Sequence, residues 1–185
     1  YQEELTRYEA DSQKLKRQLV QLSLVRLAIF LLTSLGVYQA YPNELYCLGI
    51  IVLGIAAFLF LMKKHANLKE DKNLAQALAQ INAEEIAIAN GDFHNRNTGE
   101  EFQNPKHYYS LDIDLFGRAS FFQYINRTET EEGAGALADT LLANNISEIP
   151  SRQETIKELG ALPKWRQLFA ATARLIKIQT PGASI

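Results

Sequence analysis

Four acidic residues between positions 100 and 114 are the candidates for holding a cation. Asp112 and Asp114 are two residues apart, a spacing that places both carboxylates on one face of a β-strand, and Glu100 and Glu101 precede them. A calcium loop presents its oxygen ligands in an ordered series, which this segment lacks. We therefore interpret the two aspartates as a solvated strand face and predict no metal ligand among them.

The other side chains that could do chemistry are scattered along the chain. The three histidines show no paired ligand spacing, and Ser110, Ser120 and Cys47 have no general base at a suggestive distance in sequence. The phosphate-binding pattern Gly-x-x-x-x-Gly-Lys-Ser/Thr does not occur. The sequence predicts no catalytic residue, no cofactor-binding residue and no metal site in this chain.

Two apolar runs stand out among the elements of the chain. Residues 22–41 and 45–62 are each close to the roughly 20 residues that an α-helix needs to cross the hydrocarbon core of a bilayer. A short polar turn, residues 42–44, separates them. The pattern predicts a helical hairpin with two transmembrane helices, of which the second is the more strongly apolar.

Basic residues flank both apolar runs and are absent from the turn between them. Lys14, Lys16 and Arg17 precede the first run, Arg26 lies in its opening turns, and Lys63, Lys64, His65 and Lys69 follow the second run. By the positive-inside rule, this distribution predicts that both ends of the chain face the cytoplasm and that the turn faces outward. A hairpin buried in a soluble core is the alternative, because Arg26, Ser34 and Gln39 interrupt the first run.

Polar segments with apolar stripes continue both helices beyond the apolar runs. In residues 1–21 the stripe contains Tyr1, Leu5, Tyr8, Leu15 and Leu19, and residues 63–89 carry a similar series. Because two helices joined by a short turn run back beside each other, we expect these extensions to pair as an antiparallel stalk. Two independent, frayed helices are the alternative. Asn90-Gly91 is expected to end this first domain, residues 1–90.

The rest of the chain is expected to be a loop followed by a mixed but mainly helical segment. Residues 91–108 are rich in Asn, Gly and Pro and predict a linker. Alternating apolar residues from Tyr109 to Leu115 predict a short strand. Helices are expected over 120–126 and 135–144. A third helix is expected to begin after Ser151 as its N-cap, with an inner face that contains Ile156, Leu159 and Leu162. A fourth helix is expected to begin at Pro163.

Composition limits the classes of function. The formal net charge is -2, so no overall basic excess points to nucleic acid, and a single cysteine cannot form an internal disulfide. The chain begins with Tyr1 instead of Met and ends in the loop-like run QTPGASI. We therefore expect it to be a fragment of a longer protein.

The segment LDIDLFGRASFFQYINRTETEEGAGALADTLL, followed by IPSRQETIKEL, resembles the start of the core (lever) domain of the MutS family of DNA mismatch-repair ATPases. The likeness covers roughly residues 111–176, about a third of the chain, and it implies that residues 109–185 are the incomplete N-terminal part of such a core domain. The positions that match the family pattern are Thr128, Thr130, Gly133, Leu137, Leu141, Arg152 and Gln153. The preceding hairpin resembles that of a bacterial membrane-bound MutS-like subgroup.

The resemblance implies the anchor and first core segment of a membrane-bound MutS-like ATPase in the bacterial inner membrane. It implies a homodimer, and it assigns ATP, magnesium and the ATP-binding domain to a longer parent protein. Contact with DNA is implied only for that parent. We interpret the matching residues as structural, and the alternative is that Arg127 or Arg152 contacts DNA phosphate.

A second hypothesis comes from a different class of protein. It is a non-enzymatic membrane adaptor that binds partner proteins through its helical stalk and head. A third hypothesis, which follows from the alternative of a buried hairpin, is a soluble helical module that binds other proteins.

Overall fold

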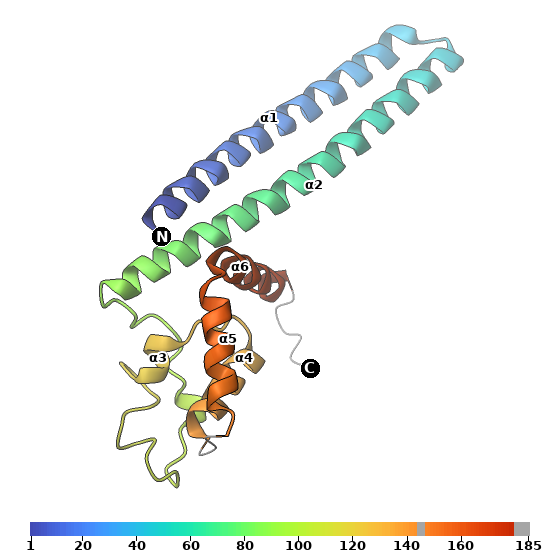
Figure 1. Ribbon diagram of the computed structural model, residues 1–185. Helices are drawn as coiled ribbons and strands as arrows, with labels where there is room; N and C mark the ends of the chain where they lie inside the picture. The colour runs from blue at the N-terminus through green and yellow to red at the C-terminus, as the bar shows by residue number, and fades with distance from the viewer. Residues whose placement is uncertain (144–146, 180–185) are drawn as a thin grey trace. The chain divides into compact units, whose positions relative to one another are not determined.

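The computed structural model describes residues 1–143 and 147–179 (Figure 1). Its helices are α1 (Gln2–Ala40), α2 (Glu44–Ala89), the 3-10 helix η1 (Glu100–Phe102), α3 (Phe121–Ile125), α4 (Glu131–Leu142), α5 (Ile149–Gly160) and α6 (Pro163–Gln179). The expectation of a mainly helical protein is confirmed, and no strand occurs in the two described ranges. Asn144, at the end of the expected helix 135–144, and residues 180–185 of the loop-like end lie outside them.

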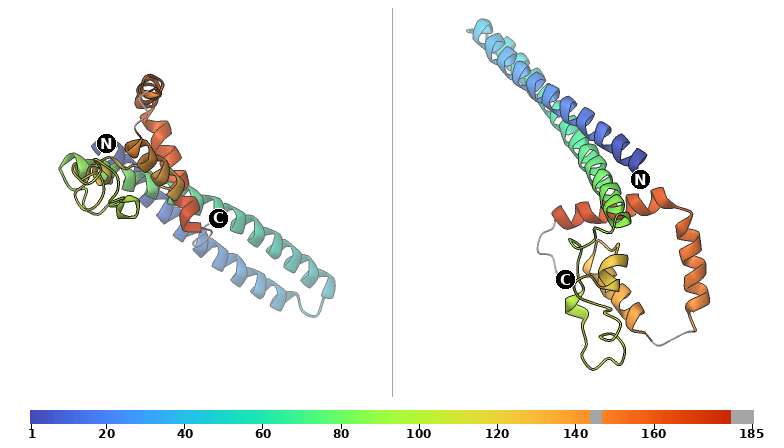
Figure 2. Two further views of the ribbon diagram at one scale, coloured as in Figure 1. Left: turned by 90° about the horizontal axis from the view of Figure 1, so that it is seen from below. Right: turned by 90° about the vertical axis from the view of Figure 1, so that its left-hand side faces the viewer.

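The chain divides into two compact units, and α2 contributes to both. The first, here called the hairpin unit, is Thr6–Gln76, and the second, here called the head unit, is Tyr1–Leu5 together with Ala77–Ile185. In the hairpin unit, α1 and α2 run side by side and antiparallel in every view (Figures 1 and 2). The turn between them falls where it was predicted, since α1 ends at Ala40 and α2 begins at Glu44.

A seam of half-buried positions runs along α1 on the side that faces α2. Within the hairpin unit these positions recur at alternating intervals of three and four residues: Tyr8, Ser12, Leu15, Leu19, Leu22, Arg26, Ile29, Thr33, Gly36 and Ala40. This repeat is the one that keeps a seam facing a partner helix in a coiled coil. The seam continues from the polar extension into the apolar run without a break, and its last three residues before the turn, Thr33, Gly36 and Ala40, are small.

The small residues of the seam bring the two helices into close contact. A Cβ atom on Gly54 would lie 2.6 Å from Thr33 Cγ2, and one on Gly36 would lie 3.4 Å from Ile50 Cγ2. Nearer the turn, the thiol of Cys47 lies 3.7 Å from the carbonyl oxygen of Val37. Small residues at a helix–helix interface allow this approach in apolar surroundings, where side-chain packing holds helices together.

We predict that Gly54→Leu separates the helices of the hairpin. Its side chain would have to displace Thr33, and overpacking of this kind costs about 1–3 kcal/mol. The measurement is the distance between spin labels at Gln21 and Lys64 in a Cys47→Ser background, which should lengthen and broaden. Gly49→Leu is the matched control, because nothing lies within 4 Å of a Cβ atom at Gly49. Equal effects of both variants would contradict the prediction.

Both apolar runs are uncovered in the described structure. None of the residues in the most apolar stretch of α1 or of α2 is buried, and the stretch in α2 is the more hydrophobic, as expected. The two helices are long and apolar enough to cross a membrane. The described residues therefore do not form the alternative structure, in which the hairpin is buried within a soluble core. Leu32, Leu53 and Phe60, for instance, remain 66%, 73% and 69% exposed.

In the head unit, α2 ends as predicted at Asn90-Gly91. Gly91 has φ +87°, and its N–H donates to Ile88 O at 2.9 Å while the N–H of Asp92 donates to Ala87 O at 2.9 Å. These two bonds close the helix with a left-handed residue, a conformation that glycine adopts at little cost. The chain then turns into the segment that carries the core of the head.

The core of the head unit is a small aromatic cluster against α4. Phe102, Phe116 and Phe122 have ring centroids 5.3–6.0 Å apart, and Phe122 is completely buried. Ala134 and Ala138 of α4 complete the buried cluster, with Leu137, Leu141 and Leu142 packed around it. Phe102 belongs to the stretch expected to be a linker, so this stretch also supplies core packing.

The predicted strand from Tyr109 to Leu115 is wrong. The chain turns here, with the N–H of Ile113 donating to Tyr109 O and that of Leu115 donating to Ser110 O. As a result the alternating apolar residues do not share a face, because Leu115 is buried while Ile113 is 57% exposed. A strand needs a neighbouring strand to satisfy its backbone groups, and none lies within the described residues, so local bonds satisfy them instead.

Helix α5 also differs from its prediction. Its N-cap is Glu148 and Pro150 lies in the first turn, so Ser151 is inside the helix instead of capping it. Proline is favoured at this position because its fixed φ suits the first turn of a helix and its missing N–H is not needed there. The expected inner face is not buried either, since Ile156 is 70% exposed and Leu162 is 46% exposed. By contrast, α3 and α6 begin where they were expected.

Candidate functional site: an ion-pair cluster in the head unit

The turn before α4 is built by the side chains of Asn126 and the two motif threonines. Asn126 Oδ1 accepts hydrogen bonds from the N–H of Thr128 at 2.8 Å and from its hydroxyl at 2.7 Å. Thr130 Oγ1 accepts from the N–H of Gly133 at 3.1 Å and is the N-cap of α4. Short polar side chains make such bonds readily, which is why they end turns and begin helices. Helix α4 therefore begins at Glu131, four residues before the predicted start.

The other residues of the family pattern fall in two places. Gly133 faces the turn, where a Cβ atom would lie 3.2 Å from Thr130 Oγ1, and Leu137 and Leu141 pack against the aromatic core. Arg152 and Gln153 lie in the second turn of another helix, α5, where Arg152 is half-buried and Gln153 is exposed. The turn and α4 thus hold five of the seven residues.

Arg127, a candidate for phosphate contact, is engaged within the protein. Its Nε donates to Glu85 Oε1 at 2.5 Å and its Nη2 donates to Glu85 Oε2 at 3.4 Å, while Nη1 donates to Tyr124 O at 2.7 Å. A phosphate at this position would have to displace the carboxylate of Glu85. The arrangement fits a residue that attaches the turn to α2.

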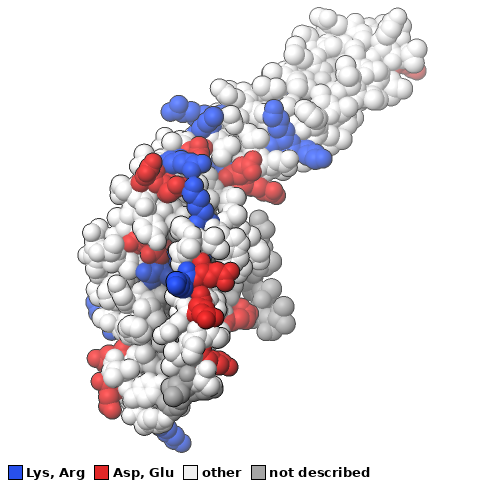
Figure 3. Space-filling view, viewed as in Figure 1, with Lys and Arg blue, Asp and Glu red and all other residues white. Residues whose placement is uncertain are grey.

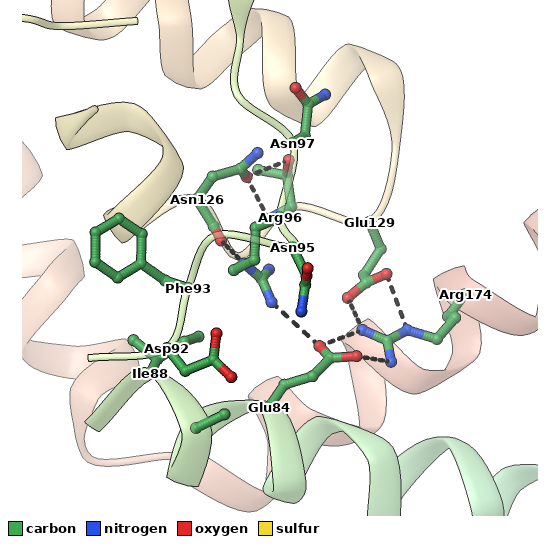
Figure 4. Close-up of a pocket in the computed structure, with 12 residues that line it drawn as sticks. Glu84, Ile88, Asp92, Phe93, Asn95, Arg96, Asn97, Asn126, Glu129 and Arg174 are labelled. Carbon is green, nitrogen blue, oxygen red and sulfur yellow. Dashed lines mark hydrogen bonds and ion pairs between the residues drawn. The ribbon is translucent and has the colours of Figure 1, made fainter. Parts of the chain in front are cut away.

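The most concentrated group of charges in the head unit surrounds Arg174 of α6 (Figure 4). One edge of its guanidinium binds Glu129, with Nε–Oε2 and Nη2–Oε1 distances of 3.0 and 2.6 Å. The other edge binds Glu84 of α2, with Nη1–Oε1 and Nη2–Oε2 distances of 2.8 and 2.9 Å. Both forks of one arginine are thus filled by carboxylates, the geometry that a planar guanidinium offers and an ammonium group cannot.

Arg96 extends this cluster to the turn before α4. Its Nη1 donates to Glu84 Oε2 at 3.1 Å, and its Nε donates to the carbonyl oxygen of Asn126 at 2.9 Å. The cluster, defined here as Glu84, Arg96, Glu129 and Arg174, contains two positive and two negative charges. It ties together α2, α6 and the turn of the family-like motif, since Glu129 lies between Thr128 and Thr130.

Burial and pairing act in opposite directions on the charges of the cluster. Burial by itself would raise the pKa of Glu84, but the hydrogen bond and charge of Arg174, with those of Arg96, outweigh it and lower the pKa below 4.5. Burial would likewise lower the pKa of Arg174, and hydrogen bonds and charge from Glu129 and Glu84 outweigh it and raise the pKa. Both groups are therefore held in their charged forms.

We predict that the head unit loses stability in acid through Glu84. Because the pKa of Glu84 is lower in the folded than in the unfolded chain, its ionised form stabilises the fold above pH 4.5, and this contribution is lost as the pH falls through the lowered value. The measurement is the urea unfolding of the full chain in detergent at several pH values from about 6 to about 3, with Trp165 fluorescence as the signal. Glu84→Gln should flatten this dependence, whereas Glu100→Gln, at an exposed position, should leave it unchanged.

A hollow of about 280 Å³ lies against the cluster. It is lined by Glu84, Ala87, Ile88, Asp92, Phe93, Asn95, Arg96, Asn97, Asn126, Thr128, Glu129 and Arg174. In the described part of the chain no three His, Cys, Asp or Glu side chains gather as a metal site would require. Because the four charges of the cluster neutralise one another, the arrangement is suited to joining elements of the head unit.

Sequence patterns gave no indication of this cluster. Glu129 and Arg174 are 45 residues apart, and Glu84 and Arg174 are 90 apart, so no local spacing relates them. Asn82 and Gln167, which exchange hydrogen bonds between α2 and α6, were missed for the same reason. The local signal beside the cluster came from Thr128 and Thr130, whose hydroxyls are typical of turns and helix starts.

The fold and the site define a mainly helical protein with two candidate membrane-spanning helices and a helical head held together by an ion-pair cluster. Comparison of the chain with models of known protein families, with curated proteins and with solved structures finds no match.

Proposed function

We propose that this chain is a membrane anchor whose hairpin spans a bilayer. The observation that carries the proposal is that neither apolar stretch has a single buried residue, although each is long enough to cross the hydrocarbon core. Contiguous apolar surface of this extent is not tolerated in water and requires a cover. Lipid is the cover that two adjacent apolar helical stretches fit, because their backbone groups are bonded within the helices.

The orientation that we propose places both chain ends in the cytoplasm, at the inner membrane of a bacterium. Between Arg26 and Lys63 the only charged residue is Glu44, at the turn. Tyr38, Tyr41 and Tyr46, near the turn, are 81%, 80% and 67% exposed, as an aromatic belt at the outer interface would be.

Extraction and labelling experiments test the anchor and its orientation. The full chain should remain in the membrane pellet after alkaline carbonate treatment. In a Cys47→Ser background, Asn43→Cys should react with an impermeant maleimide in spheroplasts, and Lys106→Cys should react only after lysis. Release by carbonate would reject the anchor, whereas the reverse labelling pattern would reject only the orientation.

We propose further that the anchor belongs to a membrane-bound MutS-like ATPase, of which residues 109–185 are the first part of the core domain. The order of Thr128, Thr130 and Gly133 supports this proposal, since these residues form one compact turn that begins α4. In this proposal ATP and magnesium bind elsewhere in the parent protein, which acts as a homodimer, and DNA is contacted by other parts of it. A native gene with no phosphate-binding loop downstream would reject the assignment.

A membrane adaptor is the second candidate, favoured by the exposed apolar surface of α6. Trp165 and Phe169 stack with ring centroids 5.5 Å apart, yet they are 53% and 65% exposed. Aromatic side chains on a surface are typical of protein interfaces. The two candidates differ in their response to nucleotide. An adaptor should give the same protease-protection pattern in its full-length native form with and without ATP, whereas an ATPase should not.

A further inference from the structure

The hairpin unit carries a band of basic side chains next to its apolar surface. We define this basic collar as Lys16, Arg17, Lys63, Lys64 and Lys69, all of which are exposed. None of the five forms an ion pair within the part of the chain that the structure describes. We propose that the collar binds the headgroups of anionic phospholipids, which goes beyond anchoring and rests on the proposed membrane anchor.

The charge pattern along the two helices isolates the collar. No Asp or Glu occurs between Asp11 and Glu44 on α1 or between Glu44 and Glu70 on α2, so the collar contains positive charges only. Figure 3 shows the end of the hairpin almost without Lys or Arg, with such side chains gathered further along the helices. Beyond the collar the sign changes, at Glu70 and Asp71 on α2, with Lys14 roughly level with Asp71. The uncompensated positive charge is thus confined to one short segment of the hairpin.

If the turn lies at one surface of the bilayer, the collar lies in the headgroup region of the other surface. From Glu44 to Lys63, α2 rises about 28 Å, close to the thickness of the hydrocarbon core. Lys69 lies about 9 Å further along, near the outer limit of the headgroup region. Helix contacts such as Thr33 with Gly54 and Arg26 with Phe58 fix the register, and place residue 16 of α1 about level with Lys69.

The collar surrounds the hairpin instead of lining one side of it. At 100° per residue, Arg17 and Lys63 lie on the faces of their helices that are turned away from the other helix. Lys64 and Lys69 lie on opposite sides of the face of α2 that contacts α1. A band of positive charge around both helices fits the headgroup layer of a bilayer through which the hairpin passes. A nucleic-acid duplex, which is a rod, would contact only part of such a ring.

The selectivity of the full chain for lipid tests the proposal. The chain is reconstituted in phosphatidylcholine bilayers, and the association of spin-labelled phosphatidylglycerol is compared with that of spin-labelled phosphatidylcholine. We expect a preference of about fivefold for the anionic lipid, the effect of roughly one well-placed basic residue per bound lipid. The combined variant Arg17→Gln, Lys63→Gln, Lys64→Gln, Lys69→Gln leaves Lys16 as the one basic residue of the collar and should lower the preference below about twofold.

A matched variant controls for the loss of four charges. Lys106, Arg118, Lys157 and Lys164 are exposed residues of the head unit, and their combined replacement by Gln should keep the fivefold preference. A loss as large as in the collar variant would overturn the proposal, as would equal association of both lipids with the unaltered chain. Because a chain with no lipid selectivity would still resist carbonate extraction, failure of the collar is distinguishable from failure of the anchor.

Two further arms separate lipid headgroups from other sources of phosphate. When inorganic phosphate replaces chloride at the same ionic strength, the lipid selectivity should be unchanged. Loss of the selectivity in phosphate would identify a site for the free ion and overturn the proposal. Labelled duplex DNA is added to the chain in phosphatidylcholine nanodiscs. DNA binding that disappears in the collar variant would assign the collar to nucleic acid and overturn the proposal.

Discussion

Replacing Arg174 by leucine is expected to destabilise the head unit by about 2–3 kcal/mol. The substitution removes four hydrogen bonds and leaves Glu129 without its partner in the cluster, while Glu84 retains only Arg96. The side chains of Arg174 and Glu129 are 17% and 16% exposed, so water can hydrate the unpaired carboxylate only in part. The expected loss is therefore somewhat smaller than for a fully buried pair.

Urea unfolding of the full chain in detergent, followed by the fluorescence of Trp165 on the same helix, measures this effect. Arg174→Lys should recover only part of the stability, because an ammonium group keeps the charge but cannot fill both forks. Arg174→Leu combined with Glu129→Leu should be less destabilised than Arg174→Leu alone, since no carboxylate is then left unpaired. Arg166→Leu, at an exposed position of α6, is the control, and a loss equal to that of Arg174→Leu would contradict the assigned role of the cluster.

Gly99→Ala is expected to cost about 2–4 kcal/mol through two separate effects. Gly99 has φ +69°, a left-handed conformation in which an L side chain is strained. In addition, a Cβ atom there would lie 2.6 Å from Cδ1 of Phe122 and 3.0 Å from Cδ1 of Phe116. Because Phe122 is completely buried in the aromatic core, it has no free space into which to move.

Gly91→Ala separates these two effects. Gly91 has φ +87°, but nothing lies within 4 Å of a Cβ atom at this position, so its replacement should cost only the backbone term of about 1 kcal/mol. Because the midpoint of urea unfolding shifts in proportion to the free energy, it should move about two to four times further for Gly99→Ala than for Gly91→Ala. Similar shifts would mean that the contact with Phe122 is not a constraint on the fold.

Local patterns were sufficient for the hairpin and for several helix ends. The apolar runs, a turn between them that lies at residues 41–43, the left-handed end of α2 at Gly91 and the start of α3 after Ser120 are all present in the structure. Each depends on a few neighbouring residues, whose length, hydropathy or hydrogen-bonding capacity acts within one or two turns of the chain. The position of Thr130 as N-cap follows from the same kind of local bond.

The sequence by itself determined that this chain is mainly helical, with two apolar runs of membrane length and basic residues at the ends of these runs that lie away from the turn. Only the tertiary structure decided the rest of the head unit. Alternation from Tyr109 to Leu115 predicted a strand that has no partner to pair with in the described residues, and local turns replace it. The cluster joining Glu84, Glu129 and Arg174 depends on packing between α2, α6 and the turn before α4. Spacing along a chain specifies a face of one helix, but it does not specify which distant charge that face will meet.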